Sequence, residues 1–242
     1  MKFQPRRLLA MWGRVLSTVP TVHGLVSRSS SAISDAEILA SFESLGDSCE
    51  FATLQKIGGV DHLALFQWSA VPLGRLADLL DDELRGVDDP KHFRVRLEAR
   101  AHGPSEYMLD HDLLQSPMHT FLNDGELTED RVLQRETRRL AVLRRKFLED
   151  ARAARRVYVY RSLAPRPMSE IFGLHQSLRR LGANRLLFVR PPGDGLEAGM
   201  VRLEGDGFAV GALDDLAVYE ASTAIRSTMW PLLLRRAFTI LH

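Results

Sequence analysis

The single cysteine of the chain, Cys49, stands where a helix is predicted to begin. It lies in Gly46-Asp47-Ser48-Cys49-Glu50-Phe51-Ala52, and the helix that follows is predicted to end at Gly58-Gly59. Backbone N–H groups and the helix dipole favour the thiolate there, which is the nucleophilic form of cysteine. The same N–H groups can hold an oxyanion, so a nucleophile and its electrostatic stabiliser would lie together. The alternative is structural, because a cysteine between apolar neighbours also packs as a small core residue.

A thiolate nucleophile needs an imidazole within hydrogen-bond reach, and the chain has eight histidines. Six of them lie in the N-terminal leader, at the C-terminus, inside a predicted helix or beside predicted turns. The other two are His111, between Asp110 and Asp112, and His119, in Pro117-Met118-His119-Thr120-Phe121. The apolar neighbours of His119 predict a neutral imidazole that can accept a proton, because desolvation disfavours the charged form. A satisfied core histidine is the alternative for this residue.

Asp110-His111-Asp112 suggests another chemistry, because it follows the apolar run Tyr107-Met108-Leu109. Two carboxylates with this spacing can hold a divalent cation against a diphosphate, as in nucleotide-sugar transferases. Glycine-rich nucleotide loops, the zinc-protease helix motif and paired-cysteine zinc patterns are absent from the sequence. We therefore expect no cofactor and no structural metal, and the Asp-x-Asp transferase stays a minor alternative.

The elements that must position these residues are mixed helices and strands. Helices are predicted at 35–42, around 48–58, at 72–84, 128–156, 169–181 and 228–241. Strands are predicted at 63–70, 93–97, 157–160, 186–189, 200–203 and 208–210, the last two forming a hairpin around Gly205-Asp206-Gly207. The strand, helix, strand order at 157–189 predicts a parallel pair with a right-handed crossover. The fold class expected is α/β: a single mixed or parallel-containing sheet flanked by helices, with a C-terminal hairpin and helix.

Charge divides the chain into two parts. The first 34 residues carry five bases and no acid, which leaves 27 bases against 31 acids in the remainder, a net of −4. Residues 1–33 therefore predict a basic amphipathic leader or linker, and residues 34–242 predict one α/β domain. A basic amphipathic helix can rest on an anionic membrane, so membrane-surface contact through residues 1–20 is one expectation. A leader rich in arginine and serine and free of acids also resembles an organelle transit peptide, which is the alternative. One cysteine fits a reducing compartment, and the sequence has no long apolar stretch, so we expect a cytoplasmic protein, with a membrane-peripheral location as an option.

The predicted helix at 128–156 is rich in arginine, with acids between the bases. A basic helix raises the question of nucleic-acid binding. The net acidity of the body and the interleaved Glu136, Glu149 and Asp150 favour a solvated face with ion pairs instead. We expect no sequence-specific nucleic-acid partner.

Several short motifs occur in a characteristic order. They are Ser44-Leu45-Gly46-Asp47-Ser48-Cys49-Glu50, Phe66-Gln67-Trp68, His119-Thr120-Phe121, residues 138–146 and Asn184-Arg185-Leu186-Leu187-Phe188-Val189. Over roughly residues 40 to 190 the chain resembles a family of uncharacterised bacterial proteins described as papain-like cysteine peptidases. Ser-Leu-Gly-x-x-Cys-Glu is the most specific part of the resemblance. Members of that family are found beside or fused to glycosyltransferases of cell-surface polysaccharide metabolism.

The resemblance implies Cys49 as nucleophile and His119 as base of a cysteine hydrolase or acyl-transfer domain. The family's Phe-Asp-Trp is Phe-Gln-Trp here, which removes a carboxylate that would orient the imidazole. Asn184, as an amide does in papain-like enzymes, or Asp112 are the candidate replacements. The residues expected to bind substrate are Ser48, Glu50, Phe66, Gln67, Trp68 and His111.

The substrate class stays open between peptide, acyl and glycan, and a glycosyltransferase partner is a further expectation from the resemblance. A second function is a non-catalytic module that binds a glycan or a glycosyltransferase. In that module Phe66, Trp68 and Tyr107 would stack on sugar faces.

Overall fold

The computed structural model describes residues 33–60, 63–100, 103–217 and 225–242. The predicted leader lies outside the described residues except for Ile33. The helices are α2 (Asp35–Ala40), α3 (Glu50–Ile57), α4 (Leu73–Asp81), η2, a single 3-10 turn (Pro90–His92), α5 (Glu129–Arg152), α6 (Met168–Leu181) and α7 (Trp230–Leu241). The strands are β1 (Phe42–Ser44), β2 (Phe93–Glu98), β3 (Glu106–His111), β4 (Ser116–Asn123), β5 (Val157–Arg161), β6 (Arg185–Arg190), β7 (Val201–Gly205) and β8 (Phe208–Ala212).

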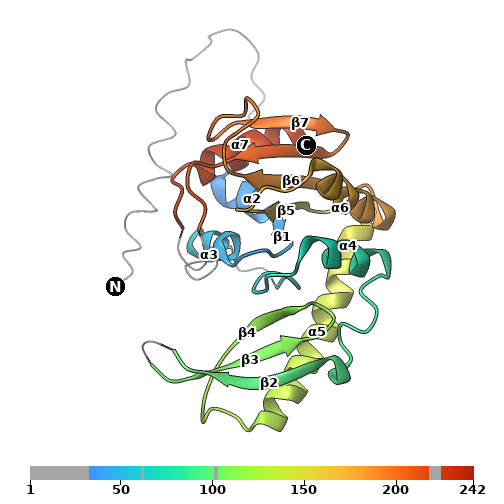
Figure 1. Ribbon diagram of the computed structural model, residues 1–242, viewed down its shortest axis with the longest axis vertical. Coiled ribbons are helices and arrows are strands. Elements are labelled where there is room, and N and C mark those ends of the chain that lie inside the picture. Colours follow the sequence, from blue (N-terminus) through green and yellow to red (C-terminus); the bar gives the residue numbers. More distant parts are fainter. Residues whose placement is uncertain (1–32, 61–62, 101–102, 218–224) are drawn as a thin grey trace.

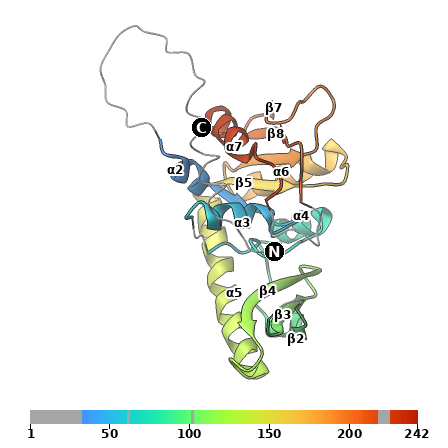
Figure 2. The same ribbon diagram turned by 90° about the vertical axis from the view of Figure 1, so that its left-hand side faces the viewer.

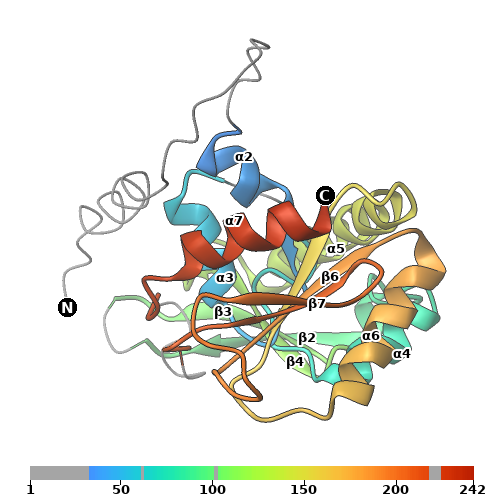
Figure 3. The same ribbon diagram turned by 90° about the horizontal axis from the view of Figure 1, so that it is seen from above.

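The larger sheet has five strands in the order β1-β5-β6-β8-β7 (Figure 1). β1, β5, β6 and β8 run parallel, and β7 pairs antiparallel with β8 in the predicted hairpin. Apolar residues follow one another without a polar break along β5 and β6, because helices cover both faces of the sheet. α2, α3 and α7 pack on one face and α4, α5 and α6 on the other (Figure 3).

A smaller antiparallel sheet, β2-β3-β4, lies apart from the first. α5 is 24 residues long, and it extends from the larger sheet along the smaller one (Figure 2). The alternation predicted at 93–97 holds only at the start of β2: Phe93 is buried and Arg94 exposed, but Leu97, on the same face as Phe93, is 42% exposed. The place of β2 in a second sheet was not predicted, because alternation shows which side of a strand is wet and leaves its neighbours unspecified.

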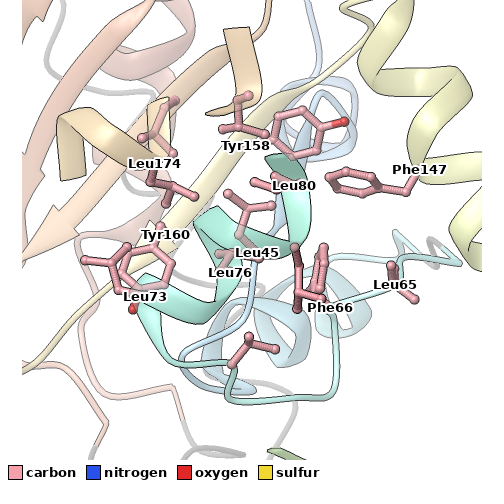
Figure 4. Packing of buried hydrophobic residues seen from close by; sticks show 14 of the residues in the cluster. Leu45, Leu65, Phe66, Leu73, Leu76, Leu80, Phe147, Tyr158, Tyr160 and Leu174 are labelled. Atoms are coloured by element: carbon pink, nitrogen blue, oxygen red, sulfur yellow. The ribbon is translucent and has the colours of Figure 1, made fainter. Parts of the chain in front are cut away.

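One continuous apolar cluster joins the two parts of the molecule. Figure 4 shows Leu45, Phe66, Leu76, Phe147 and Tyr158 packed together between the larger sheet, α4 and α5. Phe66 meets Phe147 edge to face, with ring centroids 5.4 Å apart. Contacts of this kind fix the segment after α3 against the long helix.

The predicted α/β class, the mixed sheet, the C-terminal hairpin and the C-terminal helix are confirmed. The strand predicted at 63–70 is wrong: its described part, from Leu63, forms turns with a single bridge from Ser69 to Met118. Leu65 and Phe66 are buried because the turn packs into the core, and a short apolar run indicates burial without fixing an extended backbone. The helix predicted through Phe42 ends at Ala40, and Phe42 begins β1 instead.

The described helices include none with the length and apolar character needed to cross a membrane.

Candidate functional site

Cys49 lies in the loop that joins the carboxyl end of β1 to α3. Gly46 and Asp47 in this loop have φ angles of +93° and +75°, in the left-handed region. Cys49 is the N-cap residue of α3, and its carbonyl accepts hydrogen bonds from the amide and the hydroxyl of Thr53. The prediction that the cysteine begins a helix is confirmed, and the residue is 6% exposed. In parallel α/β sheets ligands bind outside the carboxyl ends of the strands, which is where this loop lies.

Glu50, which was expected to bind substrate, is fully buried and bonded to the protein itself. Its carboxylate accepts hydrogen bonds from the Arg161 guanidinium at 3.1 Å and from the Trp230 indole at 3.3 Å. The backbone amides of Ala217 and Arg226 donate to the same carboxylate. Glu50 therefore fastens the start of α3 to β5 and α7, and it has no face for a ligand. Ser48 is also buried, and its hydroxyl accepts from the Glu50 amide.

His119 lies on β4, and a carboxylate orients its imidazole. His119 Nδ1 is 3.1 Å from Oε2 of Glu106 on the neighbouring strand β3. Glu106 is 3% exposed, and it also accepts from the Arg100 guanidinium and from the Phe121 amide. Burial opposes ionisation of this carboxyl, but the three hydrogen bonds prevail and lower its pKa. Glu106 is thus an ionised carboxylate that holds one ring nitrogen and leaves Nε2 for another partner.

Sequence reasoning missed Glu106 because nothing in its spacing connects it to His119. The two residues are not directly opposed in the β3–β4 ladder, where Met108 pairs with His119 and Glu106 with Asn123. A β-bulge between Tyr107 and Met108 shifts the register at this point. Phe121, in the stretch of β4 opposite the bulge, has a φ of +58°, and its amide reaches Glu106. Bulges and left-handed residues of this type redirect side chains, often beside functional sites.

One aromatic ring stacks on the His119 imidazole, and a second ring packs against the first. Phe121 stacks on the imidazole with centroids 5.5 Å apart, and Trp68 meets Phe121 edge to face at 4.9 Å. The ammonium of Lys56, at the end of α3, lies 5.7 Å from the Phe121 centroid. Phe121 itself is 47% exposed. The imidazole is therefore stacked on one neighbour and hydrogen-bonded to another, which leaves its ring little freedom to rotate.

The turn at 66–70 lies between the cysteine loop and the histidine strand. Trp68 accepts a hydrogen bond from the His119 amide, and Ser69 bridges to Met118. On the other side, a Cβ on Gly46 would lie 3.2 Å from the Ser69 carbonyl oxygen. Cys49 and His119 therefore belong to two segments that pack on the same turn. The His119 imidazole is hydrogen-bonded to Glu106 on the neighbouring strand.

Asn184, expected as a third catalytic residue, is not brought to the cysteine. It precedes β6, and the parallel register aligns the next residue, Arg185, with Val157 and Phe42 at the start of β5 and β1. Cys49 follows the opposite, carboxyl end of β1. The Asn184 amide nitrogen instead donates to the Leu178 carbonyl at 2.8 Å, which fastens the end of α6. The spacing of residues in the sequence could not reveal this, because the end of the sheet at which a residue lies depends on the direction of its strand.

The remaining candidates are mostly buried. His111, the last residue of β3, is 2% exposed, and its Nε2 lies 2.8 Å from the Val87 carbonyl, so its ring is buried in the protein and does not face a ligand. Burial lowers its pKa and keeps the ring neutral. Phe66 and Gln67 are buried too, whereas Trp68 is partly exposed. Of the residues expected to bind substrate, Trp68 alone is found partly exposed beside His119.

The Asp-x-Asp pair has other partners. The Nε–H of Arg96 donates to both carboxylate oxygens of Asp110, and the Asp112 carboxylate lies 3.8 Å from the Arg94 guanidinium. In the described part of the chain no three histidine, cysteine or carboxylate side chains gather as metal ligands. Asp112 lies at the far end of β3 from Glu106, so the carboxylate beside His119 is a different one from the one expected.

The comparisons with known proteins found no match to a family model, to a curated protein or to a solved structure. The resemblance to papain-like cysteine peptidases therefore stays a prediction from the sequence motifs.

Proposed function

We propose that the chain is a cysteine hydrolase or acyl-transfer domain, with Cys49 as nucleophile, His119 as general base and Glu106 as the residue that orients the imidazole. The observation that carries this proposal is the 3.1 Å contact between His119 Nδ1 and the buried Glu106 carboxylate. A carboxylate on Nδ1 selects the tautomer whose Nε2 accepts a proton, which is the arrangement of cysteine and serine hydrolases. Glu106 supplies the carboxylate that the Phe-Gln-Trp motif lacks.

The chemistry follows from these roles. His119 Nε2 takes the thiol proton, and the Cys49 sulfur attacks a carbonyl carbon to form a tetrahedral oxyanion. The backbone N–H of Cys49, at the start of α3, would help hold that oxyanion. Collapse breaks the bond to the leaving group, which takes the proton from His119 and leaves a thioester on Cys49. Water, or an acceptor hydroxyl or amine, then releases the acyl group by the reverse sequence.

The test is the rate of Cys49 alkylation by iodoacetamide between pH 5 and pH 10. We expect His119→Ala to slow the reaction at pH 7 about 10-fold or more and to move the profile to higher pH, since the thiolate loses its imidazolium partner. Glu106→Gln should give a smaller change in the same direction. His242→Ala, which removes an exposed imidazole at the C-terminus, should match the wild type. Identical profiles for the wild type and His119→Ala would contradict the proposal.

A second function, the glycan-binding module, is favoured by one observation. The pair formed by Trp68 and the 47% exposed Phe121 presents aromatic surface beside the His119 imidazole. Aromatic surface next to polar groups is the usual means of holding a sugar ring. A glycosyltransferase partner would bring such a sugar to the same surface.

Glycan-array binding separates the two functions. If the domain is a binding module, Cys49→Ser should bind the same glycans as the wild type, and Phe121→Ala should lose most of the signal. Val142→Ala, a matched change at an exposed apolar residue of α5, should leave it unaltered. The binding module would be eliminated if the wild type gave no glycan signal and the rate of Cys49 alkylation depended on His119.

A further inference from the structure

Two buried side chains at the carboxyl end of β5 have polar atoms with few partners in the protein. Tyr160 is 0% exposed and Arg161 is 4% exposed. Within the described part of the chain the Arg161 Nε–H makes no hydrogen bond, and the Tyr160 hydroxyl makes none beyond its interaction with the Asp47 carboxylate. A buried polar group without a partner is costly, and such groups are rare in the absence of a role.

The Arg161 guanidinium is only partly occupied by the protein. Its NH1 group donates to Glu50 at 3.1 Å and to the Ala217 carbonyl at 2.8 Å. Its NH2 group lies 3.9 Å from Asp47 Oδ2, beyond hydrogen-bond distance. The guanidinium therefore retains donors on the side of the cysteine loop.

Asp47 connects Arg161 with Tyr160. Successive residues of a strand point to opposite faces, so Tyr160 and Arg161 reach the end of the sheet from its two sides. The loop from Gly46 to Cys49 passes over this end, and Asp47 interacts electrostatically with Arg161, with the Tyr160 hydroxyl and with Arg166. The Asp47 side chain is 22% exposed, so this cluster opens to solvent two residues from Cys49.

The charges of the cluster favour an anion when Asp47 is neutral. Glu50 neutralises Arg161, which leaves the exposed Arg166 as the positive charge and Asp47 as the negative one. Burial raises the pKa of Asp47, although Arg161 and Arg166 oppose that shift. Glu170, at the start of α6, is the other carboxylate that acts on the Tyr160 hydroxyl.

We propose that Asp47, Tyr160, Arg161 and Arg166 form a subsite for an oxyanion, of the carboxylate or phosphate class, beside Cys49. The two guanidinium groups and the phenol donate hydrogen bonds to its oxygens, and the Asp47 carboxyl joins them when protonated. Binding of the anion therefore takes up a proton at Asp47. If the domain is the proposed hydrolase, the subsite defines its substrate class as an acyl compound with an acidic group near the scissile carbonyl. Only this statement about the substrate rests on the proposed function.

The experiment titrates Cys49→Ser protein with sodium phosphate and, separately, with sodium acetate, at constant ionic strength and pH 7, by amide NMR shifts. Arg166→Gln should weaken binding about 5-fold or more. Asp47→Asn should strengthen it by about the same factor, because it removes the like charge and keeps a residue that tolerates a positive φ. Lowering the pH to 5.5 should bring the anion affinity of the protein that retains Asp47 towards that of the Asp47→Asn variant, because Asp47 takes up a proton.

Arg145→Gln on α5 is the matched control, because it removes an exposed arginine whose described ion pair is with Glu149, which is not part of the cluster. A response to phosphate alone would assign the subsite to phosphate groups, and a response to acetate alone to carboxylates. Binding that Arg166→Gln and Asp47→Asn leave unchanged, or that Arg145→Gln weakens equally, would overturn the proposal. The thiol is absent from this protein, so failure here and failure of the alkylation test are separate results.

Discussion

Replacing Glu50 by alanine is expected to lower the free energy of unfolding by about 3 to 5 kcal/mol. The substitution leaves Arg161, which is 4% exposed, as a buried cation without its carboxylate. It also removes the acceptor for the Trp230 indole and for two backbone amides. Urea denaturation followed by circular dichroism measures the change, with an unaltered m-value as the sign that the two-state transition persists.

The control for this experiment is an ion pair on the surface. Glu149→Ala removes the partner of Arg145, and both side chains are more than half exposed. We expect a change of about 0.5 kcal/mol or less, because exposed pairs contribute little to stability. A similar loss for Glu50→Ala and Glu149→Ala would mean that the buried carboxylate does not hold the fold together.

A second buried carboxylate, Glu43, makes stability depend on pH. Glu43 lies on β1 opposite Tyr158 of β5, and it is 1% exposed. Its Oε2 atom has no hydrogen bond in the described structure, and the Lys146 ammonium lies 3.9 Å away and closer to Asp150. Burial raises the pKa of Glu43 from 4.5 to about 7, with Lys146 and Arg156 opposing the shift.

The Glu43→Gln variant should therefore be more stable than the wild type above pH 7. Between pH 4.5 and pH 7 folded Glu43 keeps a proton that the unfolded chain has lost, so its contribution to stability falls as the pH rises through this range. The loss is complete above about pH 7 and amounts to about 3 kcal/mol. Glutamine cannot ionise, so the Glu43→Gln variant does not undergo this loss of stability. The difference between the two unfolding free energies, measured from pH 4 to pH 8.5, is the observable.

Other groups also titrate in this range, so the comparison needs a control with the same change of side chain. Glu149→Gln, on the exposed side of α5, should parallel the wild type at every pH. If the difference between Glu43→Gln and the wild type stays constant from pH 4 to pH 8.5, folding does not raise the pKa of Glu43, and the prediction is wrong.

Much of the fold was predictable because strong local patterns agree with the tertiary structure. The arginine-rich helix, predicted at 128–156, runs from Glu129 to Arg152, with its apolar stripe in the core and its acids in the first turn. The parallel pair at 157–189 followed from the order strand, helix, strand. β1 was not predictable, since three residues carry no periodicity and its pairing partner begins at residue 157.

The candidate site was predictable in its parts and not in its connections. Cys49 at a helix start could be read from local sequence, and so could an imidazole with apolar neighbours at His119. Glu106 could not, because its contact with His119 depends on a bulge and a left-handed residue in β4. Glu50 and Asn184 lie elsewhere than the sequence led us to expect for a related reason: a polar residue near a motif can face the interior or lie at the opposite end of a sheet.

The position of β1 beside β5 constrains the order of folding. β1 has only three residues, yet its pairing with β5 closes a chain segment that includes α3, α4, the smaller sheet and α5. Bringing the ends of so long a segment together has an entropic cost that a few hydrogen bonds cannot offset. We therefore expect the segment to compact first, through the local contacts of α5 and the β2-β3-β4 meander, before β1 docks. The loop that carries Cys49 follows β1 directly, so we expect it to form among the last parts of the native structure.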